Sequence, residues 1–584
     1  METDLLNTPA TKAKPNAADK TGLSTNLKRK IEWILIGLLI LGYVMVSFAQ
    51  TNLNDLNFNA QSTFSPTIKD AFKFADLPEI KDSVKRLQNI NYGITSTPLF
   101  PKYQVQTIAP AKMQNEPLTK LYRSLLKVGY GPIYNMPYGE FWISNTRNRD
   151  KSYGAHLKHL SSTTHLQDVG YGGYSDNMAS VFGKQFYKKH TLSGELNYER
   201  NVIHYYGYDT TANKINDNDY TKQRYQLFEP KLQLTSHYTD SSHINHDIRL
   251  NFYNLQNLNK ESESNIKLNA LGSLFVNKEK LNIGFTTDFY NHKQSNDTLN
   301  DLIMTINPSF EAHGKKWHAD MGLSATLDQF KNATRFYFYP QLNIHYNVYE
   351  NIIIPYAGVN GGLMKNSFRS LSKENPFVDS TLHYANTNNK YNAFIGLKGN
   401  LSSNTSYDAK VSYAQYDSMH FYVIDYSSNI QLHNRFKVIY DNTTLLTVSG
   451  QLKHQLNEKL NLIVKGNYYI YKTKNIERAY HKPDYDFTFS GIYNLQSKII
   501  LRADIFVLGN QWAFSQVNTN GTNTLKPKQL NGWVDANLEV EYRYSKMLSF
   551  FARANNIAGQ RYYRWEKYPS QRFNFMLGLT FVPF

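Results

Sequence analysis

Histidines form two short groups that are the first candidates for metal binding. His156, His159 and His165 lie close together in the sequence, and His243 and His246 form a second group. On a β-strand, residues i and i+3 point to opposite faces, so neither His156 and His159 nor His243 and His246 converge on a metal by local geometry. We interpret these side chains as structural or rim histidines, and the sequence predicts no metal site.

Motifs for nucleophilic catalysis and phosphate binding are missing from the sequence. It contains no Gly-x-Ser-x-Gly nucleophile elbow, no glycine-rich phosphate loop and no cysteine. The run Asn216–Asp219 supplies oxygen ligands but lacks the turn glycine and the closing glutamate of a calcium loop. A catalytic Ser or Asp paired with a His from a distant segment remains an alternative. The sequence otherwise predicts a protein that is not an enzyme and holds no cofactor.

Two polar segments, Lys472–Pro483 and Arg561–Arg572, are rich in basic and aromatic residues. If both lie on one side of the molecule, their cationic groups suit phosphates and their rings suit sugars, as lipopolysaccharide offers. The alternative is an ordinary aromatic girdle at a membrane interface, anchored by Lys and Arg. The members of this candidate basic patch are Lys472, Lys474, Arg478, Lys482, Arg561, Arg564, Trp565 and Arg572.

The composition favours a large all-β protein. Among 584 residues there are 44 Tyr and 33 Phe, and the mean hydropathy is −0.53. Aromatic residues this frequent are unusual in disordered chains, and a single long apolar run excludes a bundle of transmembrane helices. The net charge of +17 is scattered along the chain and not gathered in one patch, so nucleic-acid binding is not expected. A cationic rim facing anionic lipopolysaccharide fits this charge better.

The single apolar run, Ile31–Phe48, predicts an export signal. Lys28, Arg29 and Lys30 precede it, and Ser47 and Ala49 place small residues at the −3 and −1 positions of a cleavage site. We therefore expect residues 1–49 to be a signal peptide that is cleaved after Ala49. An uncleaved membrane anchor is the alternative, although about 18 residues are marginal for a span.

From Leu121 to Phe584 the chain is a series of strand-length segments, many of them alternating with period 2, such as Lys459–Tyr471 and Val534–Tyr544. Two kinds of connection separate them. The short ones are Asn277–Lys280, His313–Lys316, Tyr349–Asn351, Leu401–Thr405, Gln455–Lys459 and Tyr544–Met547. The long ones are Ser161–Asp176, Asp209–Asp219, Asn366–Ala385, Lys472–Pro483 and Asn510–Gln529.

Alternating short and long connections are typical of bacterial outer-membrane barrels, which have short periplasmic turns and longer outside loops. Residues 121–584 are therefore predicted to form a transmembrane antiparallel β-barrel of about 22 strands, within a range of about 18–24. A propeller would need a blade repeat that the sequence lacks, and sandwich strands are shorter. Residues 50–120 contain six prolines and are expected to form a periplasmic or lumen-plugging segment.

The last thirty residues contain an Asn555-Asn556-Ile557 element, a Tyr568-Pro569 loop and a last strand that contains Gly578. These features resemble the final hairpin of TonB-dependent receptor barrels. This strand also resembles the signal that the barrel-assembly machinery reads, although Pro583 occupies the usual aromatic position. The residues of this candidate assembly signal are Phe573, Phe575, Gly578, Phe581 and Phe584.

The resemblance has a clear limit at the N-terminus. A plug domain in that family has about 130–150 residues and a TonB-contacting box, whereas only Gln50–Lys120 precede the barrel and Gln50–Pro66 contain no apolar box. The segment Leu121–Ser162, which includes Tyr130-Gly131 and the run His156–Ser162, is similar to the plugless receptor-like barrels of Bacteroidota. This resemblance implies transport across the outer membrane of a diderm bacterium, through a channel or receptor-like barrel.

The alternative function is a non-conducting scaffold, as an accessory subunit of an outer-membrane machine for protein assembly, secretion or uptake. The expected partners are outer-membrane lipid and lipopolysaccharide, the barrel-assembly machinery during biogenesis, and for the scaffold another outer-membrane or periplasmic protein. The sequence does not name a substrate.

Overall fold

A computed structural model describes residues 121–583, apart from 147, 216–217, 277–278, 295–296, 332, 428–431 and 520–521. The contacts between Cα atoms divide the chain into two units, and every described residue belongs to the second unit, Pro110–Phe584. The predicted signal peptide 1–49, the segment 50–120 and Phe584 of the candidate assembly signal lie outside the described residues, as do Asn216 and Asp217.

The described residues form one 22-stranded antiparallel sheet. Its first eleven strands are β1 (Ser124–Gly131), β2 (Met136–Ser144), β3 (Lys151–Ser162), β4 (Tyr174–Phe186), β5 (His190–His204), β6 (Lys222–Ser236), β7 (Asn245–Asn257), β8 (Ser262–Val276), β9 (Glu279–Gln294), β10 (Asp297–His313) and β11 (Trp317–Phe330). The other eleven are β12 (Ala333–Tyr346), β13 (Ile354–Met364), β14 (Thr387–Ser402), β15 (Thr405–Ile424), β16 (Phe436–Asn457), β17 (Leu460–Thr473), β18 (Tyr485–Leu495), β19 (Ile499–Leu508), β22 (Trp533–Arg543), β23 (Leu548–Asn555) and β26 (Asn574–Phe581).

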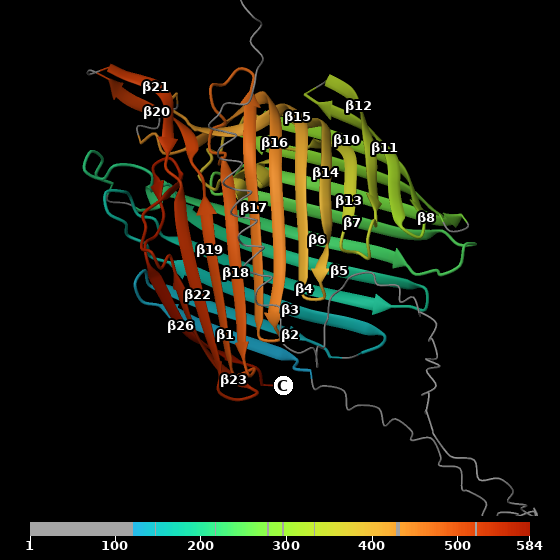
Figure 1. Cartoon of the computed structure of the whole chain (residues 1–584). Coiled ribbons are helices and arrows are strands. Elements are labelled where there is room, and N and C mark those ends of the chain that lie inside the picture. Colours follow the sequence, from blue (N-terminus) through green and yellow to red (C-terminus); the bar gives the residue numbers. More distant parts are fainter. Residues whose placement is uncertain are drawn as a thin grey trace, which may run out of the picture. The chain divides into compact units, whose positions relative to one another are not determined.

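Every strand of this sheet pairs with its neighbour along the chain, and β26 pairs with β1, so the sheet closes into a barrel (Figure 1). The prediction of an all-β barrel with about 22 strands is confirmed. The elements outside the sheet lie in the connections between its strands. They are the hairpins β20 (Gln511–Thr519)–β21 (Thr522–Leu530) and β24 (Tyr563–Trp565)–β25 (Tyr568–Pro569), the 3-10 helix η1 (Asn218–Thr221) and the helix α2 (Phe368–Glu374). No helix in the described part of the chain is long and apolar enough to cross a membrane.

The two faces of the sheet differ in polarity because successive side chains of a strand point to opposite faces. Paired residues share a face, as Val411 does with Ile395 on one side and Val448 on the other. Following such pairs around the ring gives one continuous outer belt of exposed apolar side chains. Its members include Leu157, Val181, Leu196, Leu232, Leu250, Ile266, Ile283, Ile306, Leu323, Phe338, Ile395, Val411, Val448, Phe489, Ile505, Phe550 and Leu577.

The two ends of the barrel differ in the length of their connections. At one end, called the turn end, strands are joined mostly by short turns such as 187–189, 403–404 and 458–459, and β1 begins there. At the other, called the loop end, the long connections include 163–173, 205–221, 365–386, 425–435, 474–484, 509–532 and 556–573. In their described residues, the six short turns predicted from the sequence lie at the turn end, and the five predicted long connections lie at the loop end.

The C-terminal strand β26 closes the barrel between β1 and β23. Leu577 and Phe581 on one of its faces are exposed, whereas Met576 on the other face is buried. Gly578 is required where β26 crosses Phe551, because a Cβ at this position would lie 2.3 Å from the Phe551 ring and 2.3 Å from the Val128 carbonyl oxygen. Recognition of this strand by an assembly machinery remains a prediction.

Replacing a belt residue by lysine tests which face contacts lipid. Ile395 lies at the middle of β14 and is 66% exposed. The substitution Ile395→Lys is expected to lower the free energy of unfolding of the barrel by about 2–4 kcal/mol, because a charge would enter hydrocarbon. Ser412→Lys in the adjacent β15 points to the other face and is the matched control. Unfolding by urea in lipid vesicles measures both; equal losses would contradict the assignment of faces.

Candidate functional site

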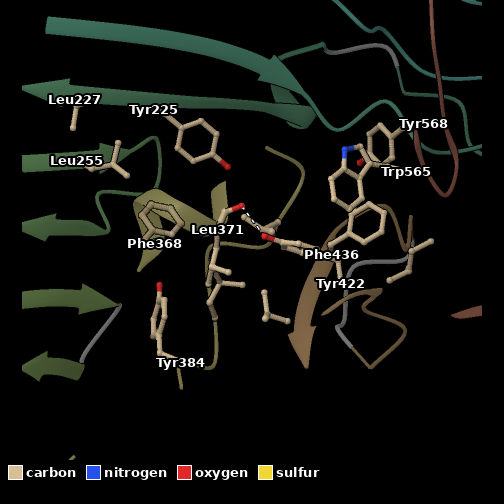
Figure 2. Close-up of a cluster of buried hydrophobic side chains, with 14 of the residues drawn as sticks. Tyr225, Leu227, Leu255, Phe368, Leu371, Tyr384, Tyr422, Phe436, Trp565 and Tyr568 are labelled. Carbon is tan, nitrogen blue, oxygen red and sulfur yellow. Dashed lines mark hydrogen bonds between the residues drawn. The ribbon is translucent and has the colours of Figure 1, made fainter. Parts of the chain in front are cut away.

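The long connections fold inward at the loop end and pack against one another, forming a unit that we call the cap. The cap has its own buried core, in which aromatic side chains predominate (Figure 2). This cap core consists of Tyr225, Leu227, Tyr253, Leu255, Phe368, Leu371, Val378, Leu382, Tyr384, Tyr422, Ile424, Phe436, Val438, Trp565 and Tyr568.

The cap core joins parts of the barrel wall that are far apart around the ring. β6 and β7 contribute four of its residues and β15 and β16 contribute four more, yet β6 and β15 are nine steps apart in the order of 22 strands. Connections 365–386 and 556–573 supply the side chains between them, including Phe368 and Trp565. Contacts between neighbouring strands of the wall cannot bring such distant strands into one cluster, so these connections cross the lumen.

Helix α2 occupies the centre of the cap and is fixed at its N-terminus by the barrel wall. Ser367 is its N-cap and forms a capping box with Ser370. The carboxylate of Glu263 on β8 accepts the backbone N–H groups of Phe368 at 2.6 Å and Arg369 at 3.2 Å. A carboxylate at this end is favourable because the first N–H groups of a helix have no partner within the helix.

The C-terminal end of α2 is held by a second carboxylate. Glu374 lies 2.7 Å from His420 Nε2 of β15 and accepts a hydrogen bond of 2.7 Å from Lys482 Nζ in connection 474–484. The Tyr422 hydroxyl donates to the same carboxylate at 3.1 Å. Glu374 therefore ties α2 to β15 and to a separate connection at once.

Further ion pairs fasten the connection that carries α2. Arg369 pairs with Glu229 of β6 at 2.7 Å, and its guanidinium lies 4.5 Å from the centre of the Tyr253 ring. Lys365 pairs with Asp301 of β10. These pairs are largely shielded from water, so removing one partner would leave a poorly solvated charge.

The hairpin β24–β25 forms the other part of the cap. The Tyr568 hydroxyl donates to the carbonyl oxygen of Asn434. Asn434 in turn donates through its side chain to the carbonyl oxygen of Tyr205 at 2.5 Å. Tyr206 donates to the carbonyl oxygen of Pro569 at 3.0 Å. These hydrogen bonds link three connections, 205–221, 425–435 and 556–573. Their acceptors are backbone oxygens, which in a flexible loop would form hydrogen bonds with water instead.

The structure brings together part of the candidate basic patch. The rings of His481 and Trp565, whose centres are 5.1 Å apart, join its two segments. Trp565 is 7% exposed and belongs to the cap core, so its ring is not presented at the surface. Lys482 is engaged with Glu374.

The remaining basic residues of this patch lie nearer to solvent. Arg478 is exposed and lies 4.5 Å from the centre of the Trp512 ring. Arg561 donates to the carbonyl oxygen of Gln167 at 2.8 Å. The side chains of Lys472, Lys474, Arg564 and Arg572 are exposed. Binding of lipopolysaccharide by these residues remains a prediction.

Two titratable groups of the cap have displaced pKa values. Burial lowers the pKa of His481 from 6.5 to about 3, so this ring is neutral at pH 7. Burial by itself would raise the pKa of Glu374, but its contacts with His420 and Lys482 outweigh burial and hold that pKa well below its usual 4.5. The cap is therefore built around an ionised carboxylate and an uncharged imidazole.

The described residues contain no group of three His, Asp or Glu side chains arranged to hold a metal ion. His156 instead lies 3.0 Å from Glu140, and His243 lies 2.5 Å from Asp240 in an exposed turn. Each contact is a side-chain hydrogen bond to a single carboxylate. Within the described residues, the loop end is closed by packed polypeptide.

Comparisons with known proteins identify the fold. No protein-family model matches the sequence, and no curated protein matches it either. The structure is similar to a mutant of the ferric enterobactin receptor PfeA from Pseudomonas aeruginosa, with a TM-score of 0.59, 12% identity and coverage of 79% of this chain and 80% of that one. It is also similar to the FrpB iron transporter from Neisseria meningitidis, with a TM-score of 0.62, 8% identity and coverage of 80% and 82%.

A third similar structure is the siderophore receptor PirA from Acinetobacter baumannii, with a TM-score of 0.61, 10% identity and coverage of 80% and 81%. At these identities the likeness establishes a common barrel fold. The chain is thus a closed β-barrel with the architecture of large receptor barrels.

Sequence reasoning missed the residues that hold the cap. Glu263, Glu374 and Asp301 look like ordinary polar positions in the sequence, because the partners described above are 46 to 108 residues away. One local signal was available. Ser367 and Ser370 around Phe368 form a capping pattern within a long polar connection, which could have predicted a short helix there.

Removing the Glu263 carboxylate is expected to free the N-terminus of α2. In Glu263→Leu two buried N–H groups lose their acceptor, which costs about 1–3 kcal/mol. Trypsin cleavage at Arg369 and Lys373 should therefore accelerate roughly tenfold or more, provided that cleavage follows local opening. Glu195→Leu, which removes a more exposed carboxylate of β5, is the control. Equal cleavage rates in both variants would contradict the role of Glu263.

Acidification is expected to loosen the cap through His481. Its pKa is depressed on folding, so the unfolded segment binds a proton that the folded one does not, and stability falls as pH drops from about 6.5 toward 3. At pH 5 the loss is about 2 kcal/mol. Native-state hydrogen exchange of residues 474–484 at pH 7 and pH 5 measures it. His481→Phe should remove most of this dependence; an unchanged pH profile in that variant would refute it.

Proposed function

We propose that this chain is an outer-membrane barrel that transports a solute across the outer membrane of a diderm bacterium, with the loop end outside. The observation that carries the proposal is the cap. A lumen enclosed by 22 strands is wider than wall side chains can fill, and here a loop assembly with its own core crosses it. A closure held by ion pairs and hydrogen bonds is suited to controlled opening.

Other observations support the same proposal. The outer belt suits lipid, and the asymmetry of the connections fits short periplasmic turns and long outside loops. The similar solved structures are a ferric enterobactin receptor, an iron transporter and a siderophore receptor. We include in the proposal the expectations of an export signal in residues 1–49, a receptor-like barrel without a plug domain and a Bacteroidota-type origin.

Conductance of the full mature chain in planar bilayers tests the proposal. The intact protein should pass little current, because the cap crosses the lumen. In Arg369→Ala/Glu374→Ala the ties of α2 to β6, β15 and connection 474–484 are lost, and frequent large openings are expected. Lys315→Ala/Glu350→Ala removes two exposed charges at the turn end and is the matched control.

A third variant lacking Gln50–Lys120 tests the expectation that this segment restricts the lumen. If current appears only when this deletion is combined with Arg369→Ala/Glu374→Ala, the cap and the segment close the passage together. Silence in every variant, with the barrel intact by gel mobility, would contradict transport and support the non-conducting scaffold.

A further inference from the structure

A cavity of about 350 Å³ lies on the lumen side of the wall beside the hairpin β24–β25. Its wall residues come from β2, β3, β4, β22, β23 and β26. Each of them has the strand position that points away from the outer belt, as Met576 does next to the exposed Leu577. The connection that carries the hairpin completes the cavity with Tyr562, Ser570 and Gln571. This volume is at the lower end of the range for small-molecule sites.

The polar lining of this cavity consists mainly of amides and hydroxyls held in place by one another. Asn555 of β23 and Asn574 of β26 are register partners, and their side chains are joined by a hydrogen bond of 2.8 Å. Asn537 accepts the backbone N–H of Asn556 at 3.0 Å. Each amide group carries both donors and acceptors, so such a lining can pair with several hydroxyl groups at once.

Neither charged group of the cavity is free to take an ionic partner without rearrangement. Arg553 donates two hydrogen bonds of 2.9 and 2.7 Å to Glu539. Asp535 accepts the Tyr562 hydroxyl at 2.7 Å through Oδ2, whereas its Oδ1 is shielded from solvent and has no hydrogen-bond partner among the described residues. An ionic ligand would have to displace these partners, and a buried charge that loses its partner is costly. The lining therefore favours an uncharged ligand.

An apolar side completes the cavity. Met136, Leu160 and Met576 line it together with the ring of Tyr174. A face of C–H groups packs well against such side chains, while hydroxyls at the edge of the same ligand reach the amides. A molecule with both features is a small polyhydroxy ring compound.

We infer that this cavity is a binding site for a small uncharged saccharide of one or two sugar units. The inference rests on the proposed function, since it names the solute class for a site on the passage. A peptide would carry terminal charges that Arg553, which is paired with Glu539, and the shielded Asp535 do not accommodate.

Occupancy of the site is positioned to influence the cap. The connection 556–573 contributes to both places: Trp565 and Tyr568 belong to the cap core, whereas Tyr562 and Ser570 line the cavity. A ligand that pairs with the cavity residues therefore acts on a segment whose other residues hold the cap closed.

Equilibrium binding to the full mature protein in detergent tests the inference, with maltose as the neutral probe and glucuronate and glucosamine as its anionic and cationic comparators. Calorimetric titration should show maltose binding more tightly than either charged sugar. In Asn555→Ala/Asn574→Ala the affinity for maltose should fall at least tenfold.

The control variant is Asn291→Ala/Asn300→Ala, which removes a register-paired amide couple with the same 2.8 Å hydrogen bond between β9 and β10, away from the cavity. Leu160→Trp, which narrows the cavity while keeping its amides, is a second test in case the first variant folds poorly. It should also weaken binding.

Three results would each overturn the saccharide site. They are no binding of maltose, maltose binding that neither cavity variant weakens relative to the control, and tighter binding of a charged sugar. The bilayer measurement separates this failure from that of the proposed function. Opening of the cap variants without saccharide binding would refute only the site, whereas binding to a barrel that never conducts would refute transport.

Discussion

Closure of the hydrogen-bonded ring is the constraint from which the other features follow. In hydrocarbon every backbone N–H and C=O must find a partner, so a sheet can cross a membrane only when its first and last strands pair, as β1 and β26 do. Pairing then fixes the faces, because register partners share a face all round the ring. With 22 strands the ring also encloses a lumen that the wall cannot fill, so something else must occupy it.

The cap meets this requirement with carboxylates as well as apolar side chains. Its aromatic core buries apolar surface, which stabilises the cap but does not fix the orientation of α2, because the hydrophobic effect is not directional. Glu263 and Glu374 fix that orientation. Glu263 accepts hydrogen bonds from the first N–H groups of α2, and Glu374 at its other end accepts one from Lys482. Glu263 is buried and Glu374 is partly shielded from water, so each carboxylate is stabilised by these partners, and displacement of α2 is penalised at both ends. Such an assembly favours two discrete states, fixed or released, over gradual loosening.

Much of the barrel could be read from the sequence because its signals are local. Turn positions, period-2 alternation and the last strand with Gly578 each depend on neighbours a few residues away. Some strands are longer than a membrane crossing requires: β16 runs for 22 residues, since its start at Phe436 extends into the cap. The cap itself could not be predicted. Trp565 was assigned to a candidate surface patch because basic residues surround it, yet its environment is set by Tyr422 and Phe436, which lie far away in the sequence.

The same limitation applies to the Asn555-Asn556-Ile557 element and the Tyr568-Pro569 pair, whose role in the cap could not be predicted from the sequence. Asn556 adopts a positive φ of 46°, and its side chain bonds to the carbonyl oxygens of Gln560 and Gln571, which shapes the connection between β23 and β26. Tyr568, from the motif's Tyr-Pro pair, then enters the cap core. β26 pairs with β1 to complete the ring, and the connection that precedes it places Trp565 and Tyr568 in the cap core. The same C-terminal segment therefore contributes both to closure of the wall and to closure of the lumen.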